Sequence, residues 1–176
     1  MTTTVSKKVC LLGDFAVGKT SLVRRFVHNL FDDKYLSTIG VKVSRKTVSV
    51  IGDERISQLT LLLWDLAGSE EFSPMQASYL RGAAGAILVC DLTRAETLAN
   101  LAGYAADLRQ LNPTAKFVLA ANKRDLAEQQ LTESQIETIA AELNAPYTLT
   151  SAKTGDEVET LFRQLGRLLL ASVSLS

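Results

Sequence analysis

One stretch of eight residues, 13–20, constrains this sequence more than any other. It reads Gly-Asp-Phe-Ala-Val-Gly-Lys-Thr and fits the phosphate-binding pattern G-x-x-x-x-G-K-[ST]. An apolar run precedes it and helical spacing follows it, which is the context that the pattern requires. In such a loop, backbone N–H groups and the start of the helix face phosphate oxygens, Lys19 reaches the terminal phosphates, and the Thr20 hydroxyl ligates Mg²⁺. The loop predicts a phosphate-bearing ligand. It does not indicate which base the ligand carries or which reaction it undergoes.

Composition narrows the class of protein. With 176 residues, 47% of them apolar, the chain is predicted to form a single domain over residues 1–176 with a proper core. Nineteen basic and nineteen acidic residues give a net charge of zero, so no overall electrostatic field favours binding to nucleic acid or to an anionic membrane. The first residues form neither a secretory signal nor a myristoylation site, which predicts a cytoplasmic protein. Cys10 and Cys90 fall in apolar runs and are expected to be buried thiols.

Hydrophobic periodicity predicts alternating strands and helices. Strands are predicted at residues 8–12, 41–50, 55–64, 84–91, 116–121 and 146–150. The helix after the loop is predicted from the spacing of Leu22, Val23, Phe26, Val27 and Leu30. Further helices are predicted over residues 74–80, over 95–111 with Leu98, Leu101, Ala102, Ala105 and Leu108 on one face, after a capping box at 132–135, and after residue 157. The pattern predicts an α/β fold of the P-loop NTPase type: a three-layer α/β/α sandwich around a six-stranded, mostly parallel sheet with one antiparallel edge strand.

Four short segments follow predicted strands and should gather at one edge of this sheet: residues 13–20, 65–68, 122–125 and 150–153. Asp65 is expected to reach Mg²⁺ through water, because Mg²⁺ takes few carboxylates. An Asp at the end of a strand is equally a cap or turn former, and both interpretations stay open here.

Asn122 and Asp125 point to the base of the ligand. They can offer a carbonyl and a carboxylate to one planar heterocycle, and a carboxylate pairs with the two N–H donors of guanine, which adenine does not have. Taken alone, this pattern is also an ordinary Asx turn.

Together these residues resemble the Ras superfamily of small GTPases, with five motifs in order over essentially the whole chain. Residues 35–40, 64–72 and 79–83 are most similar to the Rab branch. The resemblance implies a monomeric molecular switch that binds GTP or GDP with Mg²⁺ and hydrolyses GTP. It also implies that switch I around Thr38 and switch II over residues 68–80 meet protein effectors, exchange factors and activating proteins.

The resemblance further implies the roles of individual residues. Lys19 would hold the β- and γ-phosphates, and the Gly68 N–H would sense the γ-phosphate. Thr20 would ligate Mg²⁺, and Thr38 would do so only when GTP is bound. The implied phosphate-side residues are Asp14, Phe15, Ala16, Val17, Gly18, Lys19, Thr20, Ser21, Tyr35, Thr38, Asp65 and Gly68. The implied base-side residues are Phe31 edge-on to guanine, Lys123 over its face, Asn122 and Asp125 on its edge, Ser151 supporting Asp125, the Ala152 N–H on the guanine oxygen, and Lys153.

Two departures from the family bear on catalysis. Ser69 stands where the family usually has the Gln that orients the attacking water, and its hydroxyl is too short to reach that water directly. Phe15 stands where Ras has a small residue, and a side chain there obstructs the Gln and an incoming arginine finger. We therefore expect slow intrinsic hydrolysis; the alternative is that Phe15 merely packs over the loop and Glu70 positions the water.

The remaining departures concern partners. The last residues of this sequence include no prenylatable cysteine, so no membrane anchor is expected on this chain. Membrane attachment is expected only through a missing C-terminal tail or through a partner. Val43 replaces a Phe that many Rab proteins present beside Trp64 and Tyr79, so the Rab effectors are not expected to carry over unchanged. Three functions compete: a weakly hydrolysing switch, a GTP-loaded binding module without activity, and an ATP-dependent phosphotransferase, which Asn122 and Asp125 disfavour.

Overall fold

The fold is built on a six-stranded sheet. The structure is a computed structural model that describes residues 3–32, 40–51, 56–66 and 74–171. The strands are β1 (Thr3–Leu12), β2 (Val41–Ile51), β3 (Ile56–Leu66), β4 (Gly85–Asp91), β5 (Lys116–Asn122) and β6 (Tyr147–Leu149). They lie in the order β2-β3-β1-β4-β5-β6, and only the β2–β3 pair is antiparallel. The predicted mostly parallel sheet with one antiparallel edge strand is confirmed.

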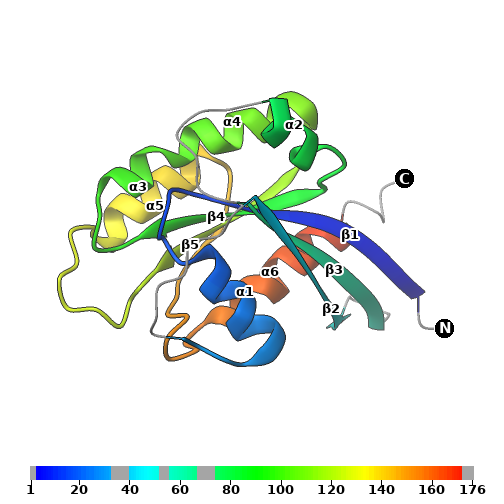
Figure 1. The fold of residues 1–176 in the computed structure, drawn as a ribbon, viewed down its shortest axis with the longest axis horizontal. Helices are drawn as coiled ribbons and strands as arrows, with labels where there is room; N and C mark the ends of the chain where they lie inside the picture. The colour runs from blue at the N-terminus through cyan, green and yellow to red at the C-terminus, as the bar shows by residue number, and fades with distance from the viewer. Residues whose placement is uncertain (1–2, 33–39, 52–55, 67–73, 172–176) are drawn as a thin grey trace.

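Helices cover both faces of this sheet. They are α1 (Lys19–His28), α2 (Pro74–Leu80), α3 (Glu96–Ala99), α4 (Leu101–Leu111), α5 (Glu133–Glu142) and α6 (Val158–Ala171). The helices pack into two separate buried clusters. One includes residues of α2, α3, α4 and α5, and the other includes residues of α1 and α6. Figure 1 shows these two layers above and below the sheet. This is the predicted three-layer arrangement.

The centre of the sheet is buried on both sides, as parallel strands require. All seven residues of β4 are buried, which explains why its sequence is apolar without alternation. Below the sheet, the rings of Phe26 and Phe162 stack 3.8 Å apart and join α1 to α6. The strands that pair in parallel end at one edge, and that edge carries residues 13–20, 65–66, 122–125 and 150–153, the described parts of the four segments singled out in the sequence.

Some element boundaries differ from the prediction for local reasons. β1 begins at Thr3 rather than Lys8, because residues 3–7 pair with 57–61 of β3; only Val5 of these five is apolar, so no apolar run marks this part of the strand in the sequence. Leu30, predicted on the buried face of α1, is 55% exposed because the helix ends at His28 and Asn29 turns the chain with φ 54°. The predicted helix over 95–111 is divided at Asn100 into α3 and α4, and Ala102 is exposed rather than on the buried face.

Other local predictions hold. Thr132 and Gln135 form the capping box that starts α5, with each side chain bonded to the other's main-chain N–H. Cys10 and Cys90 are free and buried. The connection between β2 and β3, residues 52–55, lies outside the described residues. None of the helices that the structure describes is long and apolar enough to cross a bilayer.

Candidate nucleotide site

The loop of residues 13–20 turns tightly between β1 and α1, and two glycines make its path possible. A Cβ on Gly13 would lie 2.4 Å from the main-chain oxygen of Val89. Gly18 has φ 105°, and a Cβ there would lie 2.3 Å from the Asn122 Nδ2 atom. Both positions therefore require glycine, which lets the loop lie against the ends of β4 and β5.

Lys19 lies beneath this loop. Its Nζ donates hydrogen bonds to the main-chain oxygens of Gly13, at 2.8 Å, and Asp14, at 2.9 Å. The side chain is buried, and burial lowers the pKa of Lys19 to about 8 although Asp65 and Asp14 act in the opposite direction. A buried ammonium at the start of a helix favours an anion above it, which is the arrangement that phosphate binding needs.

Thr20 and Asp65 form a pair suited to Mg²⁺. The Thr20 hydroxyl donates to Oδ2 of Asp65, which closes the apolar part of β3 and is 1% exposed. Burial raises the pKa of Asp65, while Thr20 and Lys19 lower it. Among the described residues, the Asp65 Oδ1 atom has no hydrogen-bond partner.

An unpaired buried carboxylate oxygen beside a hydroxyl fits a hydrated cation. Within the described ranges, no group of three His, Cys, Asp or Glu residues could hold a metal by itself. These residues therefore fit a Mg²⁺ ion whose remaining ligands are water and phosphate oxygens.

Asn122, at the end of β5, joins the two sides of the site. Its Nδ2 donates to the Val17 oxygen at 3.0 Å, and its Oδ1 accepts from the Thr150 hydroxyl at 3.1 Å and the Ala152 N–H at 3.3 Å. The carbonyl that the sequence assigned to the base is therefore occupied by the protein. The second N–H of the amide takes part in none of these contacts, so toward a ligand this side chain could act only as a donor.

The base-side loop is preorganised around Asp125. The Ser151 hydroxyl donates to the Asp125 Oδ1 atom at 2.7 Å, as the resemblance implied. Asp125 itself is exposed. The Ala152 N–H, expected on the guanine oxygen, instead meets Asn122 in this structure. Lys153 is exposed.

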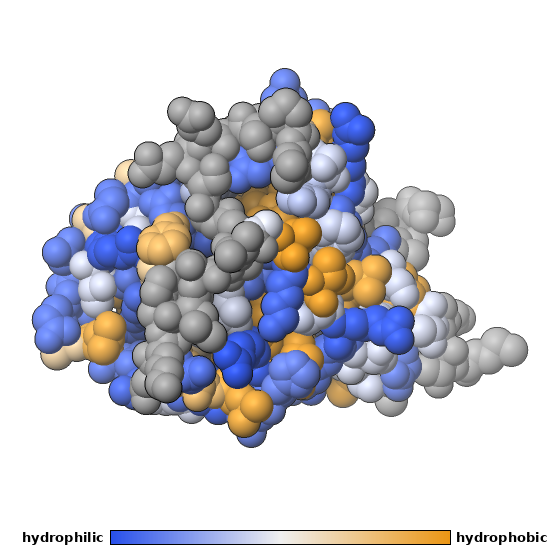
Figure 2. Space-filling model, viewed as in Figure 1, coloured by the Kyte–Doolittle hydropathy of each residue, from blue (hydrophilic) through white to orange (hydrophobic). Residues whose placement is uncertain are grey.

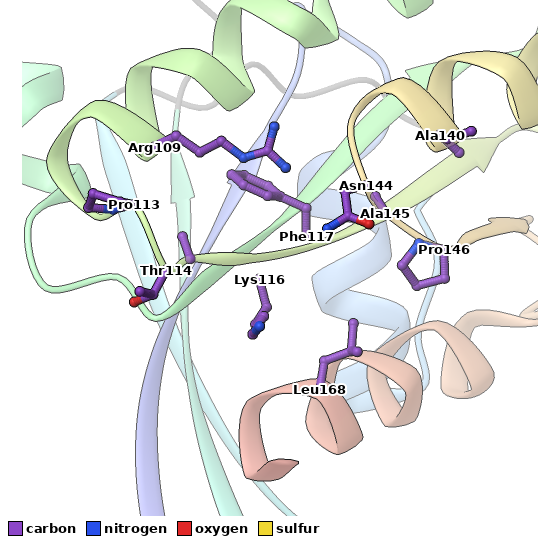
Figure 3. Close-up of a pocket in the computed structure, with 12 residues that line it drawn as sticks. Arg109, Pro113, Thr114, Lys116, Phe117, Ala140, Asn144, Ala145, Pro146 and Leu168 are labelled. Atoms are coloured by element: carbon purple, nitrogen blue, oxygen red, sulfur yellow. The ribbon is translucent and has the colours of Figure 1, made fainter. Parts of the chain in front are cut away.

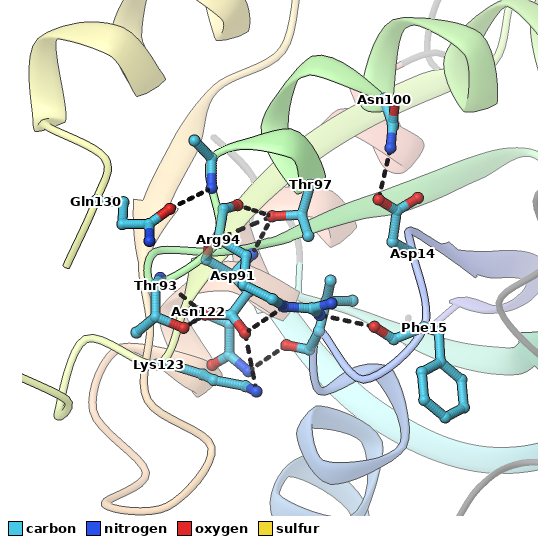
Figure 4. Close-up of polar contacts among 12 residues, drawn as sticks. Asp14, Phe15, Asp91, Thr93, Arg94, Thr97, Asn100, Asn122, Lys123 and Gln130 are labelled. Carbon is cyan, nitrogen blue, oxygen red and sulfur yellow. Dashed lines mark hydrogen bonds and ion pairs between the residues drawn. The ribbon is translucent and has the colours of Figure 1, made fainter. Parts of the chain in front are cut away.

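Lys123 does not extend freely over the position of a base. Its Nζ lies 2.9 Å from Oδ2 of Asp91, the last residue of β4 (Figure 4). Burial would raise the pKa of Asp91, but hydrogen bonds from Thr93 and Lys123 keep it below its ordinary value. Sequence reasoning missed Asp91; the signal was a carboxylate closing an apolar strand, as Asp65 does.

Asp91 also anchors Arg94, and Arg94 anchors the phosphate loop. The Arg94 Nε lies 3.2 Å from Oδ2 of Asp91, and its NH2 donates to the Phe15 oxygen at 2.6 Å. Figure 4 shows Arg94 between the two loops. This buried carboxylate therefore supports both the base side and the phosphate side of the site.

The first part of the phosphate loop is fixed by the α3–α4 pair. The Asp14 carboxylate accepts hydrogen bonds from Asn100 Nδ2 at 2.7 Å and Tyr104 OH at 2.9 Å, so it points away from the ligand position. The Asp14–Asn100 bond appears in Figure 4. Ala16 has a left-handed φ of 62°. Phe15, held between these fixed residues, is 53% exposed.

The other expected residues are less decisive. Val17 is buried, and Ser21 is half-buried in the first turn of α1. Phe31 is half-buried and packs against the cluster that α1 and α6 share. Tyr35, Thr38, Gly68 and Ser69, with Glu70, lie outside the described residues.

A partly apolar surface lies on the face over β1, β2 and β3. Val43, 51% exposed, pairs in register with Trp64, whose ring centroid lies 6.3 Å from that of Tyr79. The Lys8 Nζ lies 3.6 Å from the Trp64 ring centroid and donates to the Arg81 oxygen. Figure 2 shows apolar and charged side chains intermixed on this face.

A separate cavity of about 630 Å³ lies at the opposite edge of the sheet, near the start of β5 (Figure 3). Its lining includes Arg109, Lys116, Phe117, Asn144 and Leu168. The Arg109 guanidinium lies over the Phe117 ring, 4.6 Å from its centroid. None of the predicted site residues lines it.

Comparisons with known proteins agree with this geometry. Residues 8–171 match the Ras family. The chain is 37% identical to the Ras-related protein SEC4 of Saccharomyces cerevisiae over 163 residues, which covers 92% of this chain and 74% of that protein. It is 38% identical to mouse Ras-related protein Rab-22A, covering 91% and 81%, and 39% identical to the GTP-binding protein ypt5 of Schizosaccharomyces pombe, covering 94% and 79%.

Proposed function

This chain belongs to the Ras family of small GTPases, and from that premise we propose that it is a Rab-like guanine-nucleotide switch that hydrolyses GTP slowly. One observation carries the proposal: Asn122 of the base-side motif is bonded to Val17 of the phosphate loop. This contact holds a phosphate subsite and a base subsite at a fixed separation. A rigid site of this kind suits one nucleotide rather than phosphates in general.

Guanine is the base that the residues favour. The exposed Asp125 carboxylate can accept the two N–H donors of guanine, and Ser151 holds that carboxylate in position. The free N–H of Asn122 can meet an acceptor on the base. Adenine offers no matching pair of donors to Asp125, which argues against the ATP-dependent alternative.

The phosphates and Mg²⁺ would lie at the start of α1. Lys19 and the loop N–H groups would bind the phosphates, while Thr20 and, through water, Asp65 would hold the ion; the bound ion would offset charge that develops on the phosphates. Lys19 would then orient the terminal phosphate for attack by water. We further propose that Thr38 and Gly68 respond to that phosphate and that the two switches present themselves to effectors.

We expect slow hydrolysis from two positions. Ser69 replaces the residue that orients water in the family, and the exposed Phe15 lies on a loop held by Arg94 and Asp14, where it would stand beside the terminal phosphate of a bound nucleotide. Because that anchoring limits how far Phe15 can withdraw, its ring would also obstruct an arginine supplied by an activating protein. The same exposure supports the second candidate, a GTP-loaded binding module with no turnover.

Two measurements test the proposal. The nucleotide that copurifies is identified by chromatography, and GTP loaded on the protein is followed in a single turnover. Bound GTP or GDP with slow release of phosphate is the expected result. Bound ATP would overturn guanine recognition. If no GDP forms after many hours, the GTPase proposal is overturned and the second candidate, a GTP-loaded binding module, remains.

Asp125→Ala sharpens the test of base recognition. It should abolish the preference for GDP over ADP, because the pair of bonds to the base is lost. Glu142→Ala removes an exposed carboxylate on α5, far from the site, and should leave the preference unchanged.

A further inference from the structure

Arg25 reaches from α1 to the loop that follows β6. Its Nε donates to the Ala152 oxygen at 2.9 Å, and its NH2 donates to the Lys153 oxygen; these residues are 127 and 128 positions away in sequence. A Cβ on Gly155 would lie 3.4 Å from the Arg25 Cδ atom. The guanidinium therefore lies directly against residues 152–155.

The remaining guanidinium nitrogen of Arg25 holds the side chain at the end of α1. NH1 donates to Oδ1 of Asn29 at 3.1 Å. Asn29 ends α1 in a left-handed conformation, and its own N–H bonds to the last turn of that helix. The planar guanidinium thus contacts two elements with a geometry that a lysine cannot reproduce.

The loop that Arg25 contacts supports the base side of the site. It contains Ser151, which holds Asp125, and Ala152, which bonds to Asn122. The other end of α1 begins at Lys19, on the phosphate side. Arg25 therefore joins the two ends of the nucleotide site without touching the ligand position itself.

We propose that Arg25 is a positioning residue that retains the bound nucleotide by fastening residues 152–155 to α1. The inference rests on the guanine-nucleotide site proposed above. A nucleotide leaves when one side of its site opens, and the base-side loop cannot leave α1 without breaking two hydrogen bonds from a charged donor. Removing Arg25 should speed release while leaving hydrolysis of the bound nucleotide unchanged, because no contact of Arg25 reaches the phosphates.

The test is the release rate of a fluorescent GDP analogue in excess unlabelled GDP. Arg25→Ala should release it about 10-fold to 100-fold faster than the wild type, the range expected when hydrogen bonds to a charged group are lost. The release rate of Arg25→Lys should lie between those of the wild type and Arg25→Ala, because lysine keeps the charge and the aliphatic chain but not the several N–H donors of the guanidinium. Arg24→Ala is the matched control, since no hydrogen bond or ion pair of the Arg24 side chain occurs among the described residues.

A second readout separates positioning from a general loss of structure. In a single turnover of preloaded GTP, Arg25→Ala should hydrolyse at the wild-type rate within about twofold. Faster release together with equally altered hydrolysis would indicate a disturbed site and would overturn the proposed role.

The outcomes also separate this inference from the proposed function. A wild-type protein that binds no guanine nucleotide contradicts the proposed function before any variant is compared. A wild type that binds GDP tightly, with Arg25→Ala releasing it at the same rate, overturns the role of Arg25 alone. If Arg25→Ala does not fold, Arg25→Lys decides: faster release supports the inference and an unchanged rate overturns it.

Discussion

The side-chain amide of Asn122 donates a hydrogen bond to the main-chain oxygen of Val17 over 3.0 Å, joining loops that are 105 residues apart. The contact is possible because the next residue is Gly18, where a Cβ would lie 2.3 Å from the same amide nitrogen. The spacing of the proposed phosphate and base subsites thus depends on one glycine and one asparagine.

Gly18→Ala should therefore abolish nucleotide binding. The added methyl group would displace Asn122, and φ 105° is strained for alanine. Binding of fluorescent GDP measures the loss. Gly103→Ala is the matched control, because a Cβ there has no atom within 4 Å in the described structure and alanine favours helix α4; it should bind normally and be more stable by about 0.5–1 kcal/mol. Tight GDP binding by Gly18→Ala would contradict the close approach.

Asp91→Asn should destabilise the protein by about 3 kcal/mol near neutral pH, because it leaves Arg94 and Lys123 without a buried carboxylate. Urea unfolding, followed by the fluorescence of Trp64, measures the free energy of unfolding. Asp156→Asn removes an exposed partner of Arg124 at 3.6 Å and should cost less than about 1 kcal/mol. Equal losses in the two variants would contradict the anchoring role of Asp91.

The effect of Asp91 should also depend on pH. Its pKa is lower in the folded protein than in the unfolded chain, so its stabilising contribution is present above the unfolded value of 3.8 and is lost as pH falls through the folded pKa. The difference in unfolding free energy between the wild type and Asp91→Asn should shrink below pH 4. A difference that stays constant between pH 3 and pH 6 would show that the carboxylate charge is not responsible.

Phe15 and Ser69 should limit hydrolysis together. Ser69→Gln alone should change the single-turnover rate only slightly while the Phe15 ring remains, whereas Ser69→Gln with Phe15→Gly should accelerate it clearly. A positioned water and an arginine finger together are worth about 10³–10⁵ in rate, so even partial restoration is measurable. Phe15→Gly alone is the control for opening the site. Equal rates for Ser69→Gln and the double variant would contradict the steric argument.

The two thiols should be unreactive in the folded protein. Burial raises the pKa of Cys10 and of Cys90 to about 12, so at pH 8 the reactive thiolate is a fraction on the order of 10⁻⁴. Ellman's reagent should label neither thiol quickly in buffer and both in guanidinium chloride. Thr160→Cys, on the exposed side of α6, should add one rapidly labelled thiol. Rapid labelling of the unaltered protein would contradict the burial of these strands.

Much of the fold was predictable because its signals are local. Apolar runs and three-to-four spacing predicted every strand and most helices, and the motif ending in Lys19 and Thr20 predicted the phosphate side. The predicted boundaries were wrong where an element begins or ends without a change in the hydrophobic pattern of the sequence. β1 extends to Thr3 through pairing with β3, and α1 stops before Leu30 because Asn29 turns the chain.

The site was predictable in its residues but not in their contacts. The motif containing Asn122 and Asp125 predicts a base subsite, yet nothing local indicates that the Asn122 carbonyl is occupied by Thr150 and Ala152. Likewise Lys123 was expected over the base, and only the fold brings it to Asp91. Arg25 carried no motif at all.

The sequence by itself therefore determined the kind of ligand and the order of the elements, because a phosphate loop such as residues 13–20 is encoded in consecutive residues. The tertiary structure decided how the site is held together. Three of its contacts join residues that are 79 to 127 positions apart: Arg94 with Phe15, Asn122 with Val17, and Arg25 with Ala152. Such contacts exist only once the strands are in register, because packing of the sheet and helices brings their side chains within hydrogen-bonding distance.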